Sequence, residues 1–260
     1  TYSDGKLYTR SKKRGSIINI LETFVFHGAK KDILVDSQPH IGTNKLPKII
    51  SNIRETILSN GGEIHFDTKV IDFIIEDNCI KGVVLQNKDK VLANNTILAT
   101  GHSARDIFKL LNKKSIEIKY KPFAMGIRIE HPQYLIDQIQ YSCYERGPYL
   151  PPASYKLVTQ INKRGVYSFC MCPGGFIVPA ATNSGEIVVN GMSPSKRNSV
   201  FSNSGIVVEV KEEDLITFKK YGELKGLYYQ MALEKSMCKI NSDLQVAPAQ
   251  KMVDFINKKI

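Results

Sequence analysis

The sequence predicts a mixed α/β (α+β) chain, in which a first part with a helix and short strands precedes a strand-rich second part. Three observations predict this class. An amphipathic helical repeat ends at a glycine pair, short alternating segments separated by turn residues follow it, and most apolar runs after residue 119 are β-branched or aromatic. We therefore expect a first part at 1–118, a strand-rich part with a C-terminal helix at 119–240, and a return segment at 241–260.

The first elements follow from hydrophobic periodicity. Apolar residues recur mostly at three- and four-residue steps over Leu46–Asn60, and Gly61 and Gly62 end the pattern, which predicts a helix with a glycine C-cap. Ile64 and Phe66 then alternate with polar residues, which predicts a strand. Segments 70–76, 80–86 and 90–92, divided by turn residues at 77–78 and 87–89, predict an antiparallel meander.

The meander leads into an apolar run without polar alternation. Thr96–Thr100 therefore predicts a strand that is buried on both faces. A helix is expected from Ser103, as its N-cap, to about Leu111.

The second part contains strand-like runs divided by Pro and Gly, at 125–130, 156–161, 166–172, 176–180, 187–190 and 206–209. Glu212–Lys239 predicts a helix, which Gly222 and Gly226 weaken. Val253 and its apolar neighbours predict a terminal helix.

Composition limits the class of protein. The 260 residues are 42% hydrophobic and 23% charged, which is typical of an ordinary soluble protein. The longest apolar runs are far shorter than the roughly 18–20 residues that span a bilayer, so we expect no membrane partner. Five cysteines at irregular spacing do not form a disulfide framework, which indicates a reducing, cytoplasmic location. Because the chain starts with Thr1, we expect it to begin inside a longer gene product or after processing.

The net charge of +11 does not by itself indicate a partner. Basic residues cluster at Arg10–Arg14 and in pairs at 30–31, 113–114, 196–197 and 258–259, spread over the whole chain. This spread favours solvated faces over a nucleic-acid site. A basic RNA-associated flavoprotein or nucleic-acid-binding module stays the alternative, which steeply salt-dependent RNA binding would favour.

Several longer sequence words carry a family resemblance. They are Ser3–Leu7 (SDGKL), Pro39–Thr43 (PHIGT), Ala99–Asp106 (ATGHSARD), Gly126–Pro132 (GIRIEHP), Ser168–Gly175 (SFCMCPGG) and Asn190–Ser193 (NGMS). In this order they resemble the motifs of the bacterial FAD-dependent, "NAD(FAD)-utilising" dehydrogenase family of uncharacterised flavoproteins. The resemblance implies part of a two-dinucleotide-binding FAD domain with an inserted, strand-rich substrate domain.

The resemblance also implies a function. The parent protein would be an FAD-dependent oxidoreductase that acts on a small-molecule substrate, with NADH or NADPH as the reductant. The family's Gly-x-Gly-x-x-Gly turn, which places the pyrophosphate on a helix N-terminus, lies upstream of the Ser3–Leu7 word and is absent from this sequence. We therefore expect a central fragment that is inactive by itself. Neither the substrate nor the oligomeric state follows from the sequence.

Candidate site residues come from these words. We expect cofactor contacts from Ser3, Asp4, Gly5, Lys6, Val70, Thr100, Gly101, Gly174 and Gly175, catalytic roles for His102, Arg128 and Cys172, and no metal. Each has a structural alternative. The Ser3–Lys6 loop and the Pro173–Gly175 turn can be plain turns, and His102 can cap a helix start. His40 favours a turn role, and His65 a structural one.

Arg128 and the cysteine pair also leave alternatives open. Arg128 can bind a substrate carboxylate, or it can pair with Glu130 on the same strand face. Cys170 and Cys172 are two residues apart, so their side chains face one side of a strand, at a spacing that suits neither a strain-free disulfide nor a zinc pair. They are either buried strand residues or redox-active thiols, and the latter need a positive neighbour.

Overall fold

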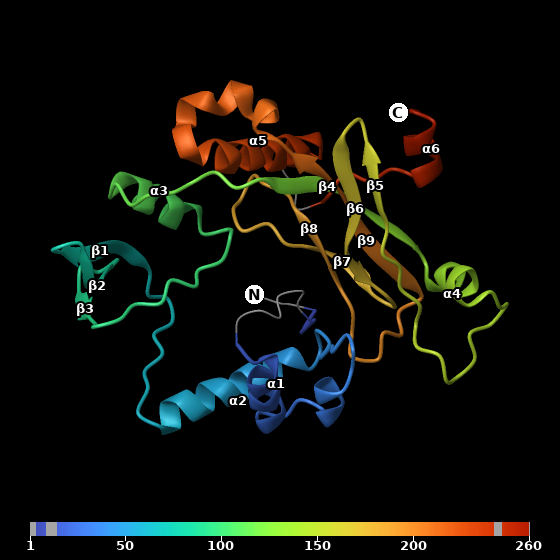
Figure 1. Cartoon of the computed structure of the whole chain (residues 1–260), viewed down its shortest axis with the longest axis horizontal. Helices are drawn as coiled ribbons and strands as arrows, with labels where there is room; N and C mark the ends of the chain where they lie inside the picture. The colour runs from blue at the N-terminus through green and yellow to red at the C-terminus, as the bar shows by residue number, and fades with distance from the viewer. Residues whose placement is uncertain (1–3, 9–14, 242–245, 260) are drawn as a thin grey trace. The chain divides into compact units, whose positions relative to one another are not determined.

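The computed structural model describes residues 4–8, 15–241 and 246–259. The chain forms two compact units (Figure 1). The first comprises 1–62, 123–210 and 235–260, and the second comprises 63–122 and 211–234. The class is a mixture of helices and antiparallel sheets, in agreement with the mixed α/β prediction. The predicted division into an FAD-binding part, a substrate part and a return segment stays a prediction.

A four-stranded antiparallel sheet organises the first unit. Its order is β4-β9-β6-β5, and the strands are β4 (Phe123–Pro132), β9 (Phe201–Val210), β6 (Arg164–Cys172) and β5 (Val158–Ile161). β4 and β9 pair over their full length, from Phe123 opposite Val210 to Pro132 opposite Phe201. The pairing of β6 with β9 is interrupted by a bulge between Phe169 and Cys172. This bulge lies in one of the sequence words and shapes the site described below.

A two-stranded ribbon and several helices complete this unit. The ribbon pairs β7 (Phe176–Pro179) with β8 (Val189–Met192). The helical elements are α1 (Ile17–Phe26), the 3-10 helix η1 (Lys31–Leu34), α2 (Leu46–Ser59), α4 (Gln133–Tyr141) and α6 (Met252–Ile256). Helix α2 ends where predicted, because Gly61 takes a left-handed φ of 82° and the Gly62 N–H donates to the Ile57 carbonyl.

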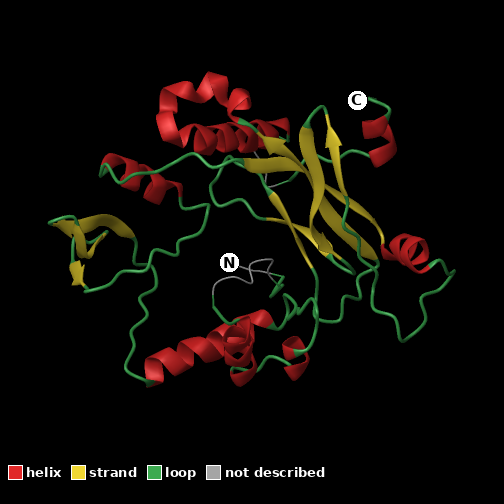
Figure 2. Cartoon of the chain, in the orientation of Figure 1, coloured by secondary structure: helices red, strands yellow, loops and turns green. Residues whose placement is uncertain are grey.

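The second unit contains a small three-stranded meander, whose strands are yellow in Figure 2. Its strands are β1 (Val70–Glu76), β2 (Cys79–Leu85) and β3 (Lys90–Leu92). Asp77 and Asn78 both have positive φ, as the predicted tight turn requires. The helical elements are α3 (Arg105–Lys113), η2 (Glu212–Leu224) and the first part of α5 (Lys225–Ile240).

Buried groups hold the second unit together. Phe73 is 4% exposed, and Leu215 is fully buried. The Arg105 guanidinium lies 2.5 Å from a Glu234 carboxylate oxygen, and both side chains are buried, so the pair is shielded from water.

Most elements agree with the sequence predictions, including the helix over 46–60, the meander and all six strand-like runs of the second part. The single helix predicted over Glu212–Lys239 is instead η2 followed by α5, because Gly222 has a non-helical backbone with a φ of 56°. The helix expected from Ser103 begins at Arg105 with Ala104 as its N-cap, and no side chain caps it. Helices α1 and α4 were not predicted.

Two predicted strands are wrong. Thr96–Thr100 is an exposed irregular segment, and Ile97 is 91% exposed. The segment around Ile64 and Phe66 is also irregular. Both predictions rested on apolar patterns, but a strand needs a neighbouring strand to pair with, and among the described residues none pairs with either segment.

In the part of the chain that is described, no helix is long and apolar enough to cross a membrane.

Candidate functional site

The site begins where the N-terminal sequence word pairs with the word at Pro39–Thr43. Lys6 and His40 form an isolated antiparallel bridge. The Leu7 N–H donates to the Pro39 carbonyl at 2.9 Å, and the Ile41 N–H donates to the Gly5 carbonyl at 2.9 Å. These backbone bonds hold the side chains of Asp4, Lys6 and His40 in the interior of the first unit.

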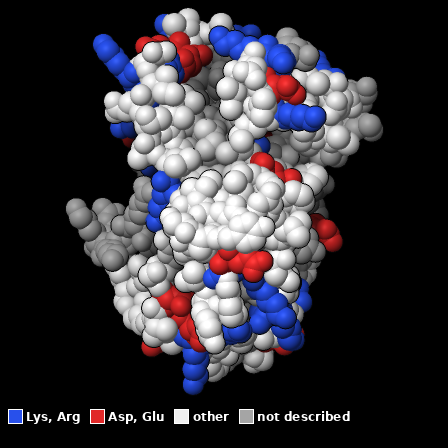
Figure 3. Space-filling model, turned by 90° about the vertical axis from the view of Figure 1, so that its right-hand side faces the viewer, with Lys and Arg blue, Asp and Glu red and all other residues white. Residues whose placement is uncertain are grey.

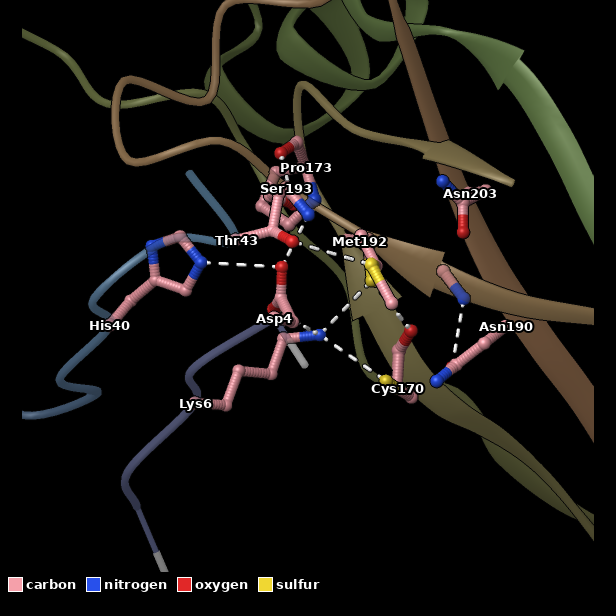
Figure 4. Close-up of polar contacts among 12 residues, drawn as sticks. Asp4, Lys6, His40, Thr43, Cys170, Pro173, Asn190, Met192, Ser193 and Asn203 are labelled. Atoms are coloured by element: carbon pink, nitrogen blue, oxygen red, sulfur yellow. Dashed lines mark hydrogen bonds and ion pairs between the residues drawn. The ribbon is translucent and has the colours of Figure 1, made fainter. Parts of the chain in front are cut away.

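Asp4 lies at the centre of this arrangement (Figure 4). Its Oδ2 atom is 3.1 Å from Lys6 Nζ, and its Oδ1 atom is 3.3 Å from His40 Nε2. Oδ1 also accepts a hydrogen bond from the Ser193 N–H. Burial raises the pKa of Asp4, but the His40 hydrogen bond, the charge of Lys6 and the Ser193 amide outweigh it, so the pKa lies below its usual value. Asp4 is therefore an ionised carboxylate in a buried place.

Lys6 connects Asp4 to the cysteine pair of β6. Its Nζ lies 3.1 Å from Cys172 Sγ and 3.4 Å from Cys170 Sγ, and Figure 4 shows Lys6 between Asp4 and Cys170. Burial lowers the pKa of Lys6, whereas Cys172, Asp4 and Cys170 raise it, and the net shift is upward. The sequence could not show a positive neighbour for these thiols, and the structure provides one.

The two cysteines differ in environment. Cys172 is fully buried, whereas Cys170 is partly exposed. The hydrogen bond from Cys172, followed by the charges of Lys6 and Arg128, lowers the pKa of Cys170 to about 5. The same hydrogen bond and burial raise the pKa of Cys172. The two thiols therefore lose their protons in separate steps, and the lowered pKa belongs to the cysteine that is only partly buried.

Arg128 of β4 adds a second cation. Its Nη1 donates to Asn203 Oδ1 at 2.5 Å and to the Cys170 carbonyl at 3.2 Å. A Cβ at Gly191 would lie 2.1 Å from that Nη1, so only glycine at this position of β8 admits the guanidinium. Of the two sequence alternatives, the pairing of Arg128 with Glu130 is not seen among the described residues, because the Arg128 guanidinium binds Asn203 of β9 and Cys170 of β6, and Glu130 is exposed.

The family model "FAD-dependent protein, C-terminal domain-like" matches residues 122–260, which is more than half of the chain. The chain belongs to this family. It is also 38% identical, over its whole length, to an uncharacterised protein of Clostridium beijerinckii, of which it covers 48%. The chain therefore spans about half the length of this curated relative.

The matched region of this FAD-dependent family includes the Pro173–Gly175 turn. The Gly174 N–H donates to Gln133 Oε1 at 2.7 Å, and Ser193 Oγ donates to the Pro173 carbonyl at 2.9 Å. A Cβ at Gly174 would meet the Arg197 carbonyl oxygen at 1.7 Å, so this glycine admits a close approach of protein backbone. Cofactor contacts of Gly174 and Gly175 stay a prediction.

The other predicted site residues belong to the second unit, except for Ser3, which lies outside the described residues. Val70 begins β1, beside a cavity of about 390 Å³ lined by Asp67–Lys69 and Leu85–Asn87. Thr100 and Gly101 are exposed, and His102 Nε2 lies 3.3 Å from Ser103 Oγ. The residues that meet around Asp4 and Lys6 form one cluster, which consists of Asp4, Lys6, His40, Arg128, Cys170, Cys172, Ser193 and Asn203. None of these cluster residues lines the cavity. The cofactor and catalytic roles of these residues stay predictions.

Sequence reasoning missed two residues of the cluster. Ser193 lies at the end of the Asn190–Ser193 word, so that word already contained its signal. Asn203 lies outside every word, and no sequence pattern indicated it. The sequence also favoured a turn role for His40, whereas its ring lies beside the Asp4 carboxylate. Among the described residues, no group of His, Cys, Asp and Glu could hold a metal ion.

The basic residues of the protein surface are dispersed. On the face drawn in Figure 3, Lys and Arg side chains of the described residues lie in separate groups beside Asp and Glu. This arrangement agrees with the solvated faces predicted from the spread of basic residues.

Proposed function

We propose that this chain is the central part of an FAD-dependent oxidoreductase that oxidises or reduces a small molecule, with NADH or NADPH as the second substrate. One observation carries the proposal. The words at 3–7, 39–43, 168–175 and 190–193, on which the family resemblance rests, are up to 189 residues apart in sequence, yet their side chains meet in one cluster of the first unit. Residues that converge in this way, with shifted pKa values, are typical of a functional site.

The chemistry of the cluster suits a flavin. Lys6 and Arg128 are cations, and the buried Asn203 Nδ2 and Arg197 Nε have no hydrogen-bond partner among the described residues. The ring carbonyls and the phosphates of FAD are acceptors, which such donors bind. When bound, the flavin supplies the reversible acceptance of a hydride. The role of Lys6 would be to hold negative charge beside it, and that of the buried Asp4 to keep Lys6 protonated and oriented.

An exposed apolar segment of the second unit is the second observation behind this proposal. Thr96–Thr100 is apolar and exposed, and the chain covers 48% of its Clostridium relative. An apolar segment of this kind becomes buried when strands pair with both of its edges. We infer that the remaining half of the protein supplies these strands, together with the glycine-rich turn that binds the pyrophosphate.

The visible spectrum of the full-length protein tests the proposal. We expect absorption bands of bound FAD and their bleaching by NADH or NADPH without oxygen. The isolated chain should bind FAD at least about 100-fold more weakly, because it lacks the backbone amides of the pyrophosphate turn. Lys6→Met in the full-length protein should weaken FAD binding, with Lys31→Met as a matched control on an exposed lysine.

Two outcomes contradict the proposal. A folded full-length protein without flavin absorption, even after FAD is added, overturns the flavin function. Tight stoichiometric binding of FAD by the isolated chain overturns the inference that the pyrophosphate turn lies elsewhere in the protein.

A further inference from the structure

We propose that Cys170 is a nucleophilic thiolate site that forms covalent adducts with small carbon electrophiles bearing a carboxylate. This inference does not depend on flavin binding. It rests on three features of the first unit: the partial exposure of Cys170 beside the fully buried Cys172, its two cationic neighbours, and the backbone bulge in which Cys170 lies.

Accessibility distinguishes Cys170 from its neighbour. The Cys172 side chain is fully buried, and its Sγ donates to the Cys170 carbonyl at 3.3 Å and accepts from Lys6 Nζ at 3.1 Å. Cys170 is partly exposed, so it is the cysteine of the pair that an incoming electrophile can approach. Cys172 therefore acts as a positioning residue, and Cys170 is the nucleophile.

Two cations face Cys170. Lys6 Nζ lies 3.4 Å from its sulfur, and the Arg128 guanidinium contacts its backbone carbonyl at 3.2 Å. The other charged or titratable groups of the cluster are Asp4 and His40, which pair with each other on the far side of Lys6. The single negative charge of Asp4 cannot neutralise both Lys6 and Arg128. A thiolate at Cys170 supplies the second negative charge.

The backbone at Cys170 has an unusual conformation. Cys170 has a φ of 49°, in the left-handed region that non-glycine residues rarely adopt, and it lies in the bulge between Phe169 and Cys172. Such strained positions persist where the surrounding structure fixes them, and they are concentrated at functional sites. In a regular strand the pairing with β9 would continue through this residue.

The carboxylate preference follows from charge balance. In a displacement, the Cys170 thiolate forms a C–S bond to the electrophilic carbon, and the leaving group departs with the electron pair of the broken bond. No proton moves. The thioether is neutral, so Lys6 and Arg128 lose one negative partner. A carboxylate on the electrophile replaces that charge, which favours anionic over neutral electrophiles by about fivefold for one unit charge a few ångströms away.

Alkylation of the native full chain, followed by peptide mass spectrometry, tests this site. Cys79, which is exposed, is the internal control. Between pH 6 and pH 8 the rate at an ordinary thiol rises roughly 70-fold with its thiolate fraction. At Cys170, whose pKa is lowered to about 5 by Cys172, Lys6 and Arg128, the rate should stay nearly constant. At pH 6 Cys170 should react about tenfold faster than Cys79, since its larger thiolate fraction outweighs its lower intrinsic nucleophilicity.

Iodoacetate and iodoacetamide separate charge preference from reactivity. The ratio of their rates should be about fivefold higher at Cys170 than at Cys79. Lys6→Met should lower the Cys170 rate at pH 6 at least tenfold, whereas Lys6→Arg should retain it. Cys172→Ser should leave the label on Cys170, because a hydroxyl also donates a hydrogen bond. The buried Cys238 stays unlabelled as long as the first unit is folded, which checks each variant.

The wild-type protein decides the result even if a variant does not fold. A Cys170 rate that rises with pH in parallel with the Cys79 rate overturns the proposed thiolate site, as does labelling of Cys172 in place of Cys170. Equal iodoacetate-to-iodoacetamide ratios at Cys170 and Cys79 overturn the carboxylate preference.

Discussion

The cluster around Asp4 and Lys6 in the first unit and the Thr96–Thr100 segment of the second unit were both singled out from the sequence. The cluster is joined by contacts between distant parts of the chain, whereas the segment is exposed. In the first unit, Asp4 contacts Ser193, and Lys6 contacts Cys172, across more than 160 residues of chain. In the second unit, Thr96–Thr100 is exposed, and Ile97 is 91% exposed.

The difference shows what a sequence pattern needs in order to become structure. The cysteines lie on β6, which pairs with β5 and β9 and is held between them. The apolar segment has no paired neighbour among the described residues, and burial of an exposed backbone without hydrogen bonds is costly.

Phe73→Ala and Ile97→Ala compare a buried and an exposed apolar residue of the second unit. Phe73 is 4% exposed, so its truncation should lower the free energy of unfolding by about 3–5 kcal/mol. Ile97→Ala should change it by less than about 0.5 kcal/mol. Urea unfolding measures both. A cost above about 2 kcal/mol for Ile97→Ala would show that this segment is buried after all. In the full-length protein, we expect Ile97→Ala to become destabilising.

Asp4→Asn tests the buried charge cluster. Removal of this carboxylate leaves Lys6 buried with less compensation, and we expect a loss of about 3 kcal/mol in the free energy of unfolding. Glu63→Gln is the matched control, because the Glu63–His65 pair is exposed and 2.9 Å apart. The control should cost less than about 1 kcal/mol. Similar losses for the two variants would contradict the role of burial.

Gly126→Ala and Gly165→Ala compare two glycines of the same sheet. A Cβ at Gly126 would lie 1.9 Å from the Ile206 carbonyl oxygen, so β4 and β9 must move apart, at a cost of about 1–3 kcal/mol. A Cβ at Gly165 meets nothing within 4 Å, and its replacement should be neutral or slightly stabilising. Thermal unfolding checks the order, and a reversed order would be inconsistent with the β4–β9 register.

The pH dependence of stability should show a smaller effect of Asp4. Its folded pKa is depressed, so the stability that it contributes is present above the unfolded value of about 3.9 and is lost as the pH falls through the folded value. Between pH 5 and pH 2, the free energy of unfolding should therefore fall more steeply in the wild type than in Asp4→Asn. Parallel curves would show that the pKa of Asp4 is not lowered by folding.

The sequence predicted many elements because their signals are local. Helix α2 followed from three- and four-residue apolar steps and a glycine pair, and the meander followed from alternation and the left-handed Asp77-Asn78 turn. Helix α1 was missed although Ser16 at its N-cap and the polar face of Asn19, Glu22 and Thr23 are signals of an amphipathic helix. For the candidate site, the sequence supplied Asp4, Lys6, Cys172 and Arg128 as separate candidates, but no local signal connected them.

The mixed class, the positions of most strands and the words of the FAD-dependent family follow from the sequence. Which of those words lie together, and which groups surround the two cysteines, follows from the tertiary structure. The pKa of Cys170 is lowered by a hydrogen bond from its near neighbour Cys172, and also by Lys6 and Arg128, which are 164 and 42 residues away along the chain. Coulomb interactions and hydrogen bonds depend on distance in space, and the distance between such residues is fixed only when the strands that hold them pair.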